Sequence, residues 1–209
     1  MRKARQKQIF LVVEIKDGRF FATAVGEGGE TLLEYERTEN ISVEPDADAR
    51  AFVLECRSAL EKPNIRIRLG VVTDLRDVDF VDCELLKSEG ELIREEMSLV
   101  SKDGAALLVR IGEQIRTVLA VGGACTESNY AQDGNTEKPK KLAEHILSLC
   151  SLVRVDTVII EALGKYANDG VAVTECLKNK LGDKTEIRVL EKSSLAAFSM
   201  LRILCDQKY

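Results

Sequence analysis

Residues 12–25 read VVEIKDGRFFATAV. Apolar runs lie on both sides of Asp17-Gly18, a dipeptide typical of the tight turn in a β-hairpin. The pattern predicts two antiparallel strands at residues 8–15 and 19–26. Some enzymes bind a phosphate at such a turn, so the residues of the turn decide whether this hairpin is a nucleotide site.

The segments that follow the hairpin extend it into a larger unit. A Gly28-Gly29 turn leads into residues 31–39, which predict a third strand and hence an antiparallel meander. Residues 45–62 have helical apolar spacing and are followed by Pro63. The stretch NIRIRLGVVTDL at 64–75 alternates and then becomes continuously apolar, which predicts a buried strand.

The second half of the chain repeats this plan. Residues 102–123 predict a hairpin around Gly112-Glu113-Gln114. After it we expect helices and strands in alternation, at residues 140–153 (helix), 155–163 (strand), 170–182 (helix), 186–190 (strand) and 193–205 (helix). Gly182 is expected to end the second of these helices, and Ser193 or Ser194 to cap the last one. Residues 84–97 predict a short interrupted helix, and residues 126–141 a polar loop.

This duplication predicts the fold class. Each half opens with a hairpin and passes through a helix into a strand that should join the sheet in parallel. We therefore expect an α/β protein of two lobes, residues 1–97 and 98–209, with a cleft between them.

Composition excludes several classes of protein. Hydrophobic residues make up 45% and charged residues 31% of the chain, which is typical of a soluble globular protein rather than a disordered or membrane-spanning one. The net charge of −5 argues against general nucleic-acid binding. The basic residues Arg2, Lys3, Arg5 and Lys7 either touch phosphates or form a solvated tail, and the tail is favoured. The apolar run after them is too short for a signal peptide.

The cysteines point to a reducing compartment. The six cysteines are dispersed, and the only histidine is His145. Structural zinc needs clustered thiolate or imidazole ligands, so we expect no metal site. The expected location is the cytoplasm.

Three further stretches carry a family resemblance. The opening QIFLVVEIKDGRFFATAVGEGGETLLE, the helix and strand LAEHILSLCSLVRVDTVIIEAL, and the closing EIRVLEKSSLAAFSMLRIL resemble the ROK proteins in order and phrasing. These are bacterial sugar kinases and repressors within the actin-like ATPase superfamily. The resemblance implies a ribonuclease H-like (actin-like ATPase) fold, with two lobes that each contain a mixed sheet opening in an antiparallel meander and helices packed on the sheets.

The resemblance also implies where a nucleotide would bind. In the first phosphate loop, Glu14 stands for the family's metal-arranging aspartate, and Lys16, Asp17, Gly18 and Arg19 replace Gly-Gly-Thr-Lys. Glycine is needed there because backbone N–H groups must approach phosphate oxygens closely. The opening hairpin is therefore expected to be a hairpin only.

The other two nucleotide contacts diverge as well. In the second phosphate loop, Gly112 and Ile115 persist, whereas the family's threonine and glycines are replaced by Glu113, Gln114, Arg116 and Val118. A carboxylate beside a triphosphate costs about 1 kcal/mol or more. The Gly-Gly pair on the adenosine side becomes Glu161-Ala162. We expect no bound cofactor.

The sugar side lacks its expected groups too. The family's catalytic aspartate has its nearest counterpart in Asp103, which is also explained as a turn residue of Asp103-Gly104. The resemblance implies that the family's sugar-binding Glu-x-x-Gly-His motif and its cysteine-rich zinc motif fall between residues 120 and 140. This stretch contains Cys125, Glu127 and Glu137 but no histidine. His145 is expected on a helix surface, and Cys125 is the cysteine best placed for exposure.

An acidic string follows the strand at 64–75. Its carboxylates could hold Mg²⁺, or they could belong to an exposed edge strand whose charges block association of sheets; the edge strand is favoured. The string comprises Asp74, Asp77, Asp79, Asp82 and Glu84.

Together these residues favour a catalytically degenerate ROK-like protein that is a regulatory, ligand-sensing or assembly domain, as a homodimer or with a small-molecule or protein ligand. The alternative is a small divergent sugar or metabolite kinase that binds ATP in the interlobe cleft, with Glu14 and Asp103 as catalytic residues and Lys16 or Arg19 on phosphate. A third possibility is a protein-interaction module. The family's repressors carry a DNA-binding segment ahead of this domain, and with about eight residues before the first strand we expect no direct DNA binding.

Overall fold

The computed structural model describes residues 6–16, 19–38, 45–75, 78–130, 138–182, 184–191 and 193–206. The chain divides into two compact units. Unit 1 comprises Met1–Leu92 and Ala196–Tyr209, and unit 2 comprises Ile93–Leu195. Each unit is built on one sheet of five strands.

The sheet of unit 1 has the strand order β3-β2-β1-β4-β5. Strands β1 and β2 form the predicted hairpin, with Ile15 opposite Phe20, and β3 continues the antiparallel meander. Strand β4 joins β1 in parallel and β5 joins β4 in parallel. The strands are β1 (Lys7–Lys16), β2 (Arg19–Gly26), β3 (Thr31–Thr38), β4 (Ile65–Thr73) and β5 (Cys83–Lys87).

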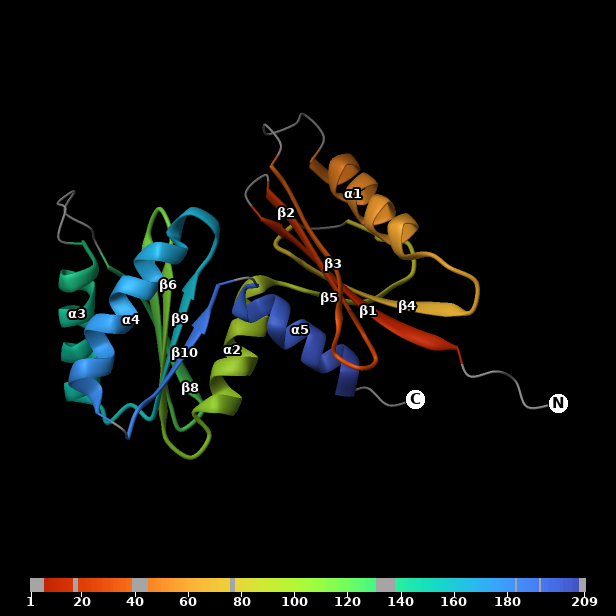
Figure 1. Ribbon diagram of the computed structural model, residues 1–209. Helices are drawn as coiled ribbons and strands as arrows, with labels where there is room; N and C mark the ends of the chain where they lie inside the picture. The colour runs from red at the N-terminus through yellow and green to blue at the C-terminus, as the bar shows by residue number, and fades with distance from the viewer. Residues whose placement is uncertain are drawn as a thin grey trace. The chain divides into compact units, whose positions relative to one another are not determined.

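Helices cover both faces of this sheet (Figure 1). Helix α1 (Pro45–Leu60) packs Phe52 and Val53 against the odd-numbered side chains of β1, such as Leu11. Successive side chains of a strand point to opposite faces. The even-numbered face is therefore the one covered by helix α5 (Leu195–Asp206), and the Gly70 backbone closely approaches its Met200.

Unit 2 repeats the same plan with the strand order β10-β9-β6-β7-β8. Strands β6, β7 and β8 form an antiparallel meander, and β9 and β10 add in parallel. The strands are β6 (Ala105–Ile111), β7 (Ile115–Val121), β8 (Ala124–Tyr130), β9 (Thr157–Ala162) and β10 (Glu186–Leu190). The duplicated order confirms the predicted fold class.

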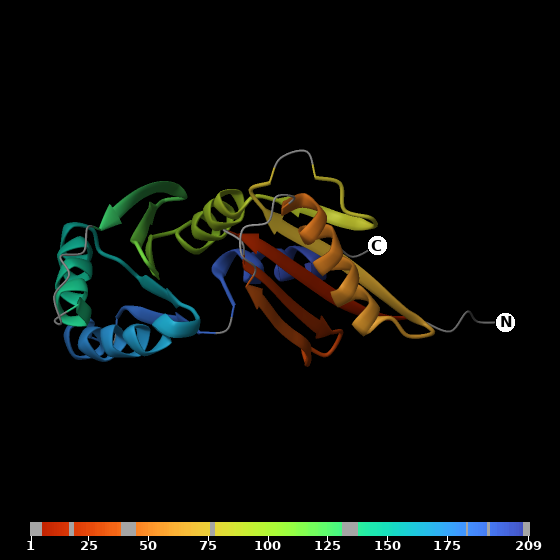
Figure 2. The same ribbon diagram turned by 90° about the horizontal axis from the view of Figure 1, so that it is seen from above.

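The helices of unit 2 also lie on both faces of their sheet. Helices α3 (Lys138–Leu152) and α4 (Ala167–Leu181) pack on one face, and Figures 1 and 2 show them together. The later turns of α2 (Glu89–Val100) lie on the other face, beside Gly123 and Cys125. A short 3-10 helix, η1 (Gly164–Tyr166), precedes α4. Gly182 ends α4 with φ 68°, as predicted.

Two segments differ from the sequence-based prediction. Residues 124–130 form the edge strand β8, although residues 126–130 were predicted as the start of a polar loop. Main-chain pairing with β7 supplies their hydrogen bonds, while most of their side chains are polar and exposed. Residues 83–87 form β5 rather than helix, and α2 begins only at Glu89. Ser88 and Glu91 form a capping box there, with the Ser88 N–H 2.9 Å from Glu91 Oε2 and the Glu91 N–H 3.2 Å from Ser88 Oγ.

The division between the units falls within α2, as the predicted boundary between residues 97 and 98 does. The prediction placed the whole C-terminal part in the second lobe, whereas the structure groups Ala196–Tyr209 with unit 1. Whether residues 1–97 and 98–209 are separate folding domains stays a prediction. Within the described ranges, no helix is long and apolar enough to cross a membrane.

Candidate functional site

Lys16, the last residue of β1 before the hairpin turn, forms an ion pair. Lys16 Nζ lies 2.7 Å and 2.8 Å from the two carboxylate oxygens of Glu89. Glu89 is the first residue of α2, and its side chain is 10% exposed. A carboxylate at a helix N-terminus is stabilised by the helix dipole. Glu89 therefore interacts favourably with the N-terminus of α2 as well as with the Lys16 ammonium. Arg19 is exposed on β2, and the predicted site residues Asp17 and Gly18 lie outside the described residues.

Glu14 lies in the middle of the same sheet. It is 7% exposed and stands opposite Phe21 of β2 and Val72 of β4. Its even-numbered position on β1 places it on the face that carries Arg68 and Gly70 of β4. A carboxylate is therefore retained at the position where the resemblance implies a metal-arranging residue.

The turn between β6 and β7 contains Gly112, Glu113 and Gln114. The Glu113 side chain is 79% exposed and lies 4.0 Å from Lys165 Nζ, which makes it a loose surface pair. A Cβ on Gly112 would meet only the Gln114 carbonyl oxygen, at an ordinary 3.4 Å. The space around Gly112 therefore does not require a glycine at this position. Ile115 and Val118 are buried in the sheet.

Glu161 lies at the carboxyl end of β9 and makes two buried contacts. Arg110 Nε of the neighbouring strand β6 donates to Glu161 Oε1 at 2.8 Å. The Leu195 N–H, at the start of α5, donates to Glu161 Oε2 at 2.8 Å. Glu161 is 5% exposed and the adjacent Ala162 is fully buried. The carboxylate thus binds the helix N-terminus at a point where an external anion could otherwise bind.

The remaining candidates are dispersed in unit 2. Asp103 is exposed in the turn before β6. His145 is half-buried on α3, with its ring 4.5 Å from that of Tyr130, and burial lowers its pKa. Glu127 is exposed on β8, and Glu137 lies outside the described residues. The structure does not gather these groups into one cluster.

The prediction that Cys125 is the most exposed cysteine is wrong. Cys125 is half-buried, and its thiol lies 3.9 Å from the Arg94 carbonyl oxygen. Burial raises its pKa although Arg94 acts in the opposite direction. Cys205 on α5 is the exposed cysteine. The β8 strand explains the difference, because its pairing brings Cys125 against α2.

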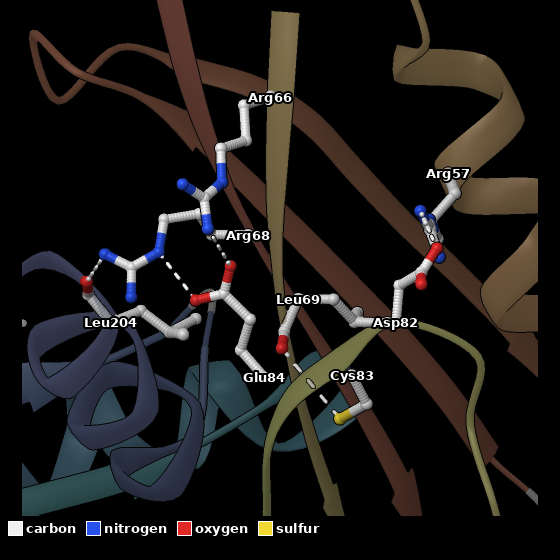
Figure 3. A network of polar contacts seen from close by, with 8 residues as sticks. All are labelled: Arg57, Arg66, Arg68, Leu69, Asp82, Cys83, Glu84 and Leu204. Atoms are coloured by element: carbon white, nitrogen blue, oxygen red, sulfur yellow. Dashed lines mark hydrogen bonds and ion pairs between the residues drawn. The ribbon is translucent and has the colours of Figure 1, made fainter. Parts of the chain in front are cut away.

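Asp77 of the acidic string lies outside the described residues, and the other members are divided between the segment before β5 and the edge strand β5 itself. Asp82 Oδ2 lies 3.0 Å from an Arg57 nitrogen, and Glu84 binds two arginines of β4 (Figure 3). Over the part of the chain that is described, no group of three or more His, Cys, Asp or Glu side chains could hold a metal ion. The interpretation of the whole string as an edge strand is wrong, because β5 begins only at Cys83 and Glu84 is the only described member of the string that lies on it.

Arg68 is a buried charge that the sequence analysis missed. Its side chain is 2% exposed, and Nε lies 2.7 Å from Glu84 Oε2. Another of its nitrogens donates to the Leu204 carbonyl oxygen at 2.7 Å, near the C-terminal end of α5 (Figure 3). The guanidinium also lies 5.8 Å from the centre of the Phe10 ring. The alternation in NIRIRLG placed Arg66 and Arg68 on one face, but only the course of α5 buries Arg68.

Comparison with known proteins yields structures only. No protein-family model and no curated protein matches the chain. The inorganic polyphosphate/ATP-glucomannokinase of Arthrobacter sp. strain KM is 12% identical, with a TM-score of 0.58 over 96% of this chain and 100% of that chain. A ROK family protein from Streptococcus pneumoniae TIGR4, in complex with sucrose, is 12% identical, with a TM-score of 0.53 over 94% of this chain and 97% of the other.

A ROK family transcriptional regulator, homologous to the E. coli MLC protein, is also similar. It is 7% identical, with a TM-score of 0.53 over 96% of this chain and 79% of that one. Likenesses at such low identity concern the fold. They agree with the duplicated five-stranded sheets, and the chain has the actin-like ATPase fold of sugar kinases and ROK proteins.

Proposed function

We propose that this chain, with its actin-like ATPase fold, is a catalytically degenerate ROK-like protein that has lost ATP-dependent sugar phosphorylation. It would serve as a regulatory, ligand-sensing or assembly domain. Solved structures of this fold include both a kinase and a transcriptional regulator, so the fold alone does not choose between the two roles. The choice rests on the residues at the three nucleotide contacts.

The observation that carries the proposal is the buried contact set of Glu161. Its carboxylate occupies the position where the resemblance implies the adenosine-side Gly-Gly, and Arg110 and the Leu195 N–H hold it. Moving it aside would leave Arg110, which is 14% exposed, without this partner. Separating a buried pair is costly because a charge loses its compensation. A nucleotide would therefore meet an anion that the fold itself stabilises.

The Lys16–Glu89 pair supports the same proposal. The kinase alternative needs Lys16 or Arg19 to bind phosphate. Both oxygens of Glu89 already contact the Lys16 ammonium, and Glu89 also interacts favourably with the N-terminus of α2. A triphosphate would have to compete with this carboxylate, whereas Arg19 is exposed on the other strand of the hairpin.

Isothermal titration of the whole protein with Mg-ATP tests the proposal. We expect no saturable heat at millimolar nucleotide, and the same with a nonhydrolysable ATP analogue. Micromolar binding of either would overturn it. Glu161→Gly is an informative companion, because it removes the carboxylate that we hold responsible. Glu34→Gly is its control, since Glu34 is exposed on β3 and belongs to none of the three nucleotide contacts.

The alternative is a small divergent kinase for a sugar or another metabolite, and the buried Glu14 favours it. A carboxylate kept at this position of β1 has chemistry suited to a metal. A coupled ADP-release assay over a panel of sugars tests this alternative. Turnover that disappears in Glu14→Ala, but persists in Glu34→Ala on the exposed strand β3, would establish it.

The proposed partners are a second copy of this chain and a small-molecule or protein ligand. Size-exclusion chromatography with light scattering distinguishes a monomer from a stable dimer. The cytoplasm remains the proposed location, because all six cysteines are free in the structure.

A further inference from the structure

A hollow of about 500 Å³ lies in unit 1 at the N-terminal end of β1. Its wall is formed by the first residues of β1, the turn between β2 and β3, and the chain from the end of α1 to the start of β4. Lys16, in the first phosphate loop, lies at the opposite end of β1. The hollow is therefore separate from the residues discussed so far, and its volume lies in the range of small-molecule sites.

The hollow has an apolar part. Ile9 and Leu60 are 5% and 7% exposed, so they belong to the core of unit 1 and form a firm wall. Leu32 and Ile65 also line the hollow, and Leu32 is 44% exposed. An aliphatic group placed against these side chains would be removed from water, and burial of apolar surface is favourable.

Charges of opposite sign lie at opposite sides of the hollow. Glu27 and Glu30 come from the β2–β3 turn, and Lys7 and Lys62 come from the start of β1 and the segment after α1. In the sheet β1 lies between β2 and β4, with Ile9 opposite Gly26 and Lys7 opposite Ile65. The acidic turn thus lies on the β2 side of β1, and the lysines lie at the start of β1 and on its β4 side, one to two strand spacings of about 5 Å away.

These four charged side chains lack ion-pair partners in the described part of the protein. By contrast, the arginines drawn in Figure 3 and Lys16 of the first hairpin each pair with a carboxylate. Glu30 is also closely positioned. Its carboxylate lies where a Cβ on Gly26 or Gly28 would be, so both glycines are needed for it to lie against the turn. The Gly26 N–H donates to the Glu30 carbonyl oxygen at 2.9 Å, which fixes the backbone of this residue.

We propose that this hollow binds a small zwitterion with an aliphatic group: a free aliphatic amino acid or a short aliphatic peptide with free ends. Its ammonium group would pair with Glu27 and Glu30, and its carboxylate with Lys7 and Lys62. Its side chain would lie against Ile9 and Leu60. An ion with a single charge would leave one side of the hollow uncompensated, and this selects the zwitterion.

NMR titration of the full-length protein with leucine and with leucyl-leucine tests the assignment and separates the two sources of the zwitterion. We expect saturable shifts of the backbone amides that line the hollow, for one ligand or both. The half-molecules 3-methylbutylamine and 4-methylpentanoate should bind severalfold more weakly, because each lacks one charge. No saturable shift with either zwitterion, or equal binding of a half-molecule, would overturn the proposal.

Two variants make the test specific. Glu30→Gln keeps the shape of the side chain and removes its charge, so it should weaken binding severalfold, as expected for a partly exposed ion pair. Glu34→Gln removes a charge from β3, the strand that follows Glu30, outside the hollow, and should leave binding unchanged. Equal effects of the two would contradict the assignment. The result is independent of the nucleotide titration, which reports on Glu161 at the other unit.

Discussion

Arg68 shows at the level of single residues how unit 1 accommodates a buried charge. Its guanidinium has an acidic partner on the edge strand β5 and a main-chain partner on α5. The group therefore joins three elements that are far apart in the sequence. The charge of Arg68 is buried, so its partners must remain in place.

We expect Glu84→Gln to lower the free energy of unfolding by roughly 3 kcal/mol, because it leaves the Arg68 charge buried without its carboxylate. Arg66 pairs with the same carboxylate at 3.4 Å but is 49% exposed. Arg66→Gln is thus the matched control and should cost less than about 1 kcal/mol. Urea unfolding followed by circular dichroism measures both, and equal losses would contradict the assigned role of Arg68.

His145 offers a second residue-level prediction, because it is the only histidine. Burial lowers its pKa, so the unfolded chain binds a proton more readily between the folded pKa and the ordinary value of about 6.5. Its contribution to stability is therefore complete at neutral pH and is lost as the pH falls through that window. NMR titration of the single imidazole should give a pKa below about 6.5.

The Tyr130 ring is a large part of the cover over His145. Tyr130→Ala should raise the imidazole pKa toward its ordinary value, whereas Tyr166→Ala, in another part of unit 2, should leave it unchanged. A wild-type imidazole pKa at or above the ordinary value would show that the surroundings of His145, including the Tyr130 ring, do not bury it.

At the scale of elements, α5 packs closely on the first sheet. A Cβ on Gly70 would lie 2.7 Å from Met200 Cγ and 2.8 Å from its sulfur. We expect Gly70→Ala to cost about 1–3 kcal/mol, because the well-packed contact has no room for a methyl group. Thermal or urea unfolding measures the loss.

Two comparisons make this prediction specific. Adding Met200→Ala to Gly70→Ala creates space, so the double variant should cost less than the sum of the two single changes. Gly112→Ala should be nearly neutral, because its new Cβ makes only an ordinary contact. Additive losses would show that the helix and the strand do not touch in the way described.

At the scale of the whole molecule, the chain ends in unit 1 although the preceding strand belongs to unit 2. Ala196, Met200 and Leu204 of α5 are fully buried. Burial of a large apolar side chain such as Met200 or Leu204 contributes about 1.5–3 kcal/mol, which is not small beside the net 5–15 kcal/mol by which a domain is usually stable, so loss of the helix should destabilise unit 1.

Deletion of residues 196–209 should therefore destabilise unit 1, although residues 1–92 remain intact. Hydrogen exchange should become fast in β1 and β4, and a peptide of residues 193–209 added in trans should slow it again. Deletion of residues 207–209 alone serves as the control and should change little. Unchanged protection of β1 after the longer deletion would contradict the grouping of α5 with unit 1.

Some features of this protein follow from the sequence alone. The hairpin at Asp17-Gly18, the meanders and the parallel strands were predictable, because apolar periodicity and turn residues are local properties of the chain. The residue types at the positions where the resemblance implies phosphate loops were also readable, since they need only the sequence. Strand β8 was not predictable, because its polar side chains carry no apolar pattern and only pairing with β7 makes it a strand.

Only the tertiary structure decided which partners the charged side chains contact. That Glu161 contacts Arg110 and the start of α5, that Glu89 neutralises Lys16, and that Arg68 reaches the end of α5 all join positions distant in the sequence. The hollow beside Glu30 likewise forms where three separate segments meet. Such contacts depend on strand register and on the direction of each chain crossing, and no local pattern encodes them.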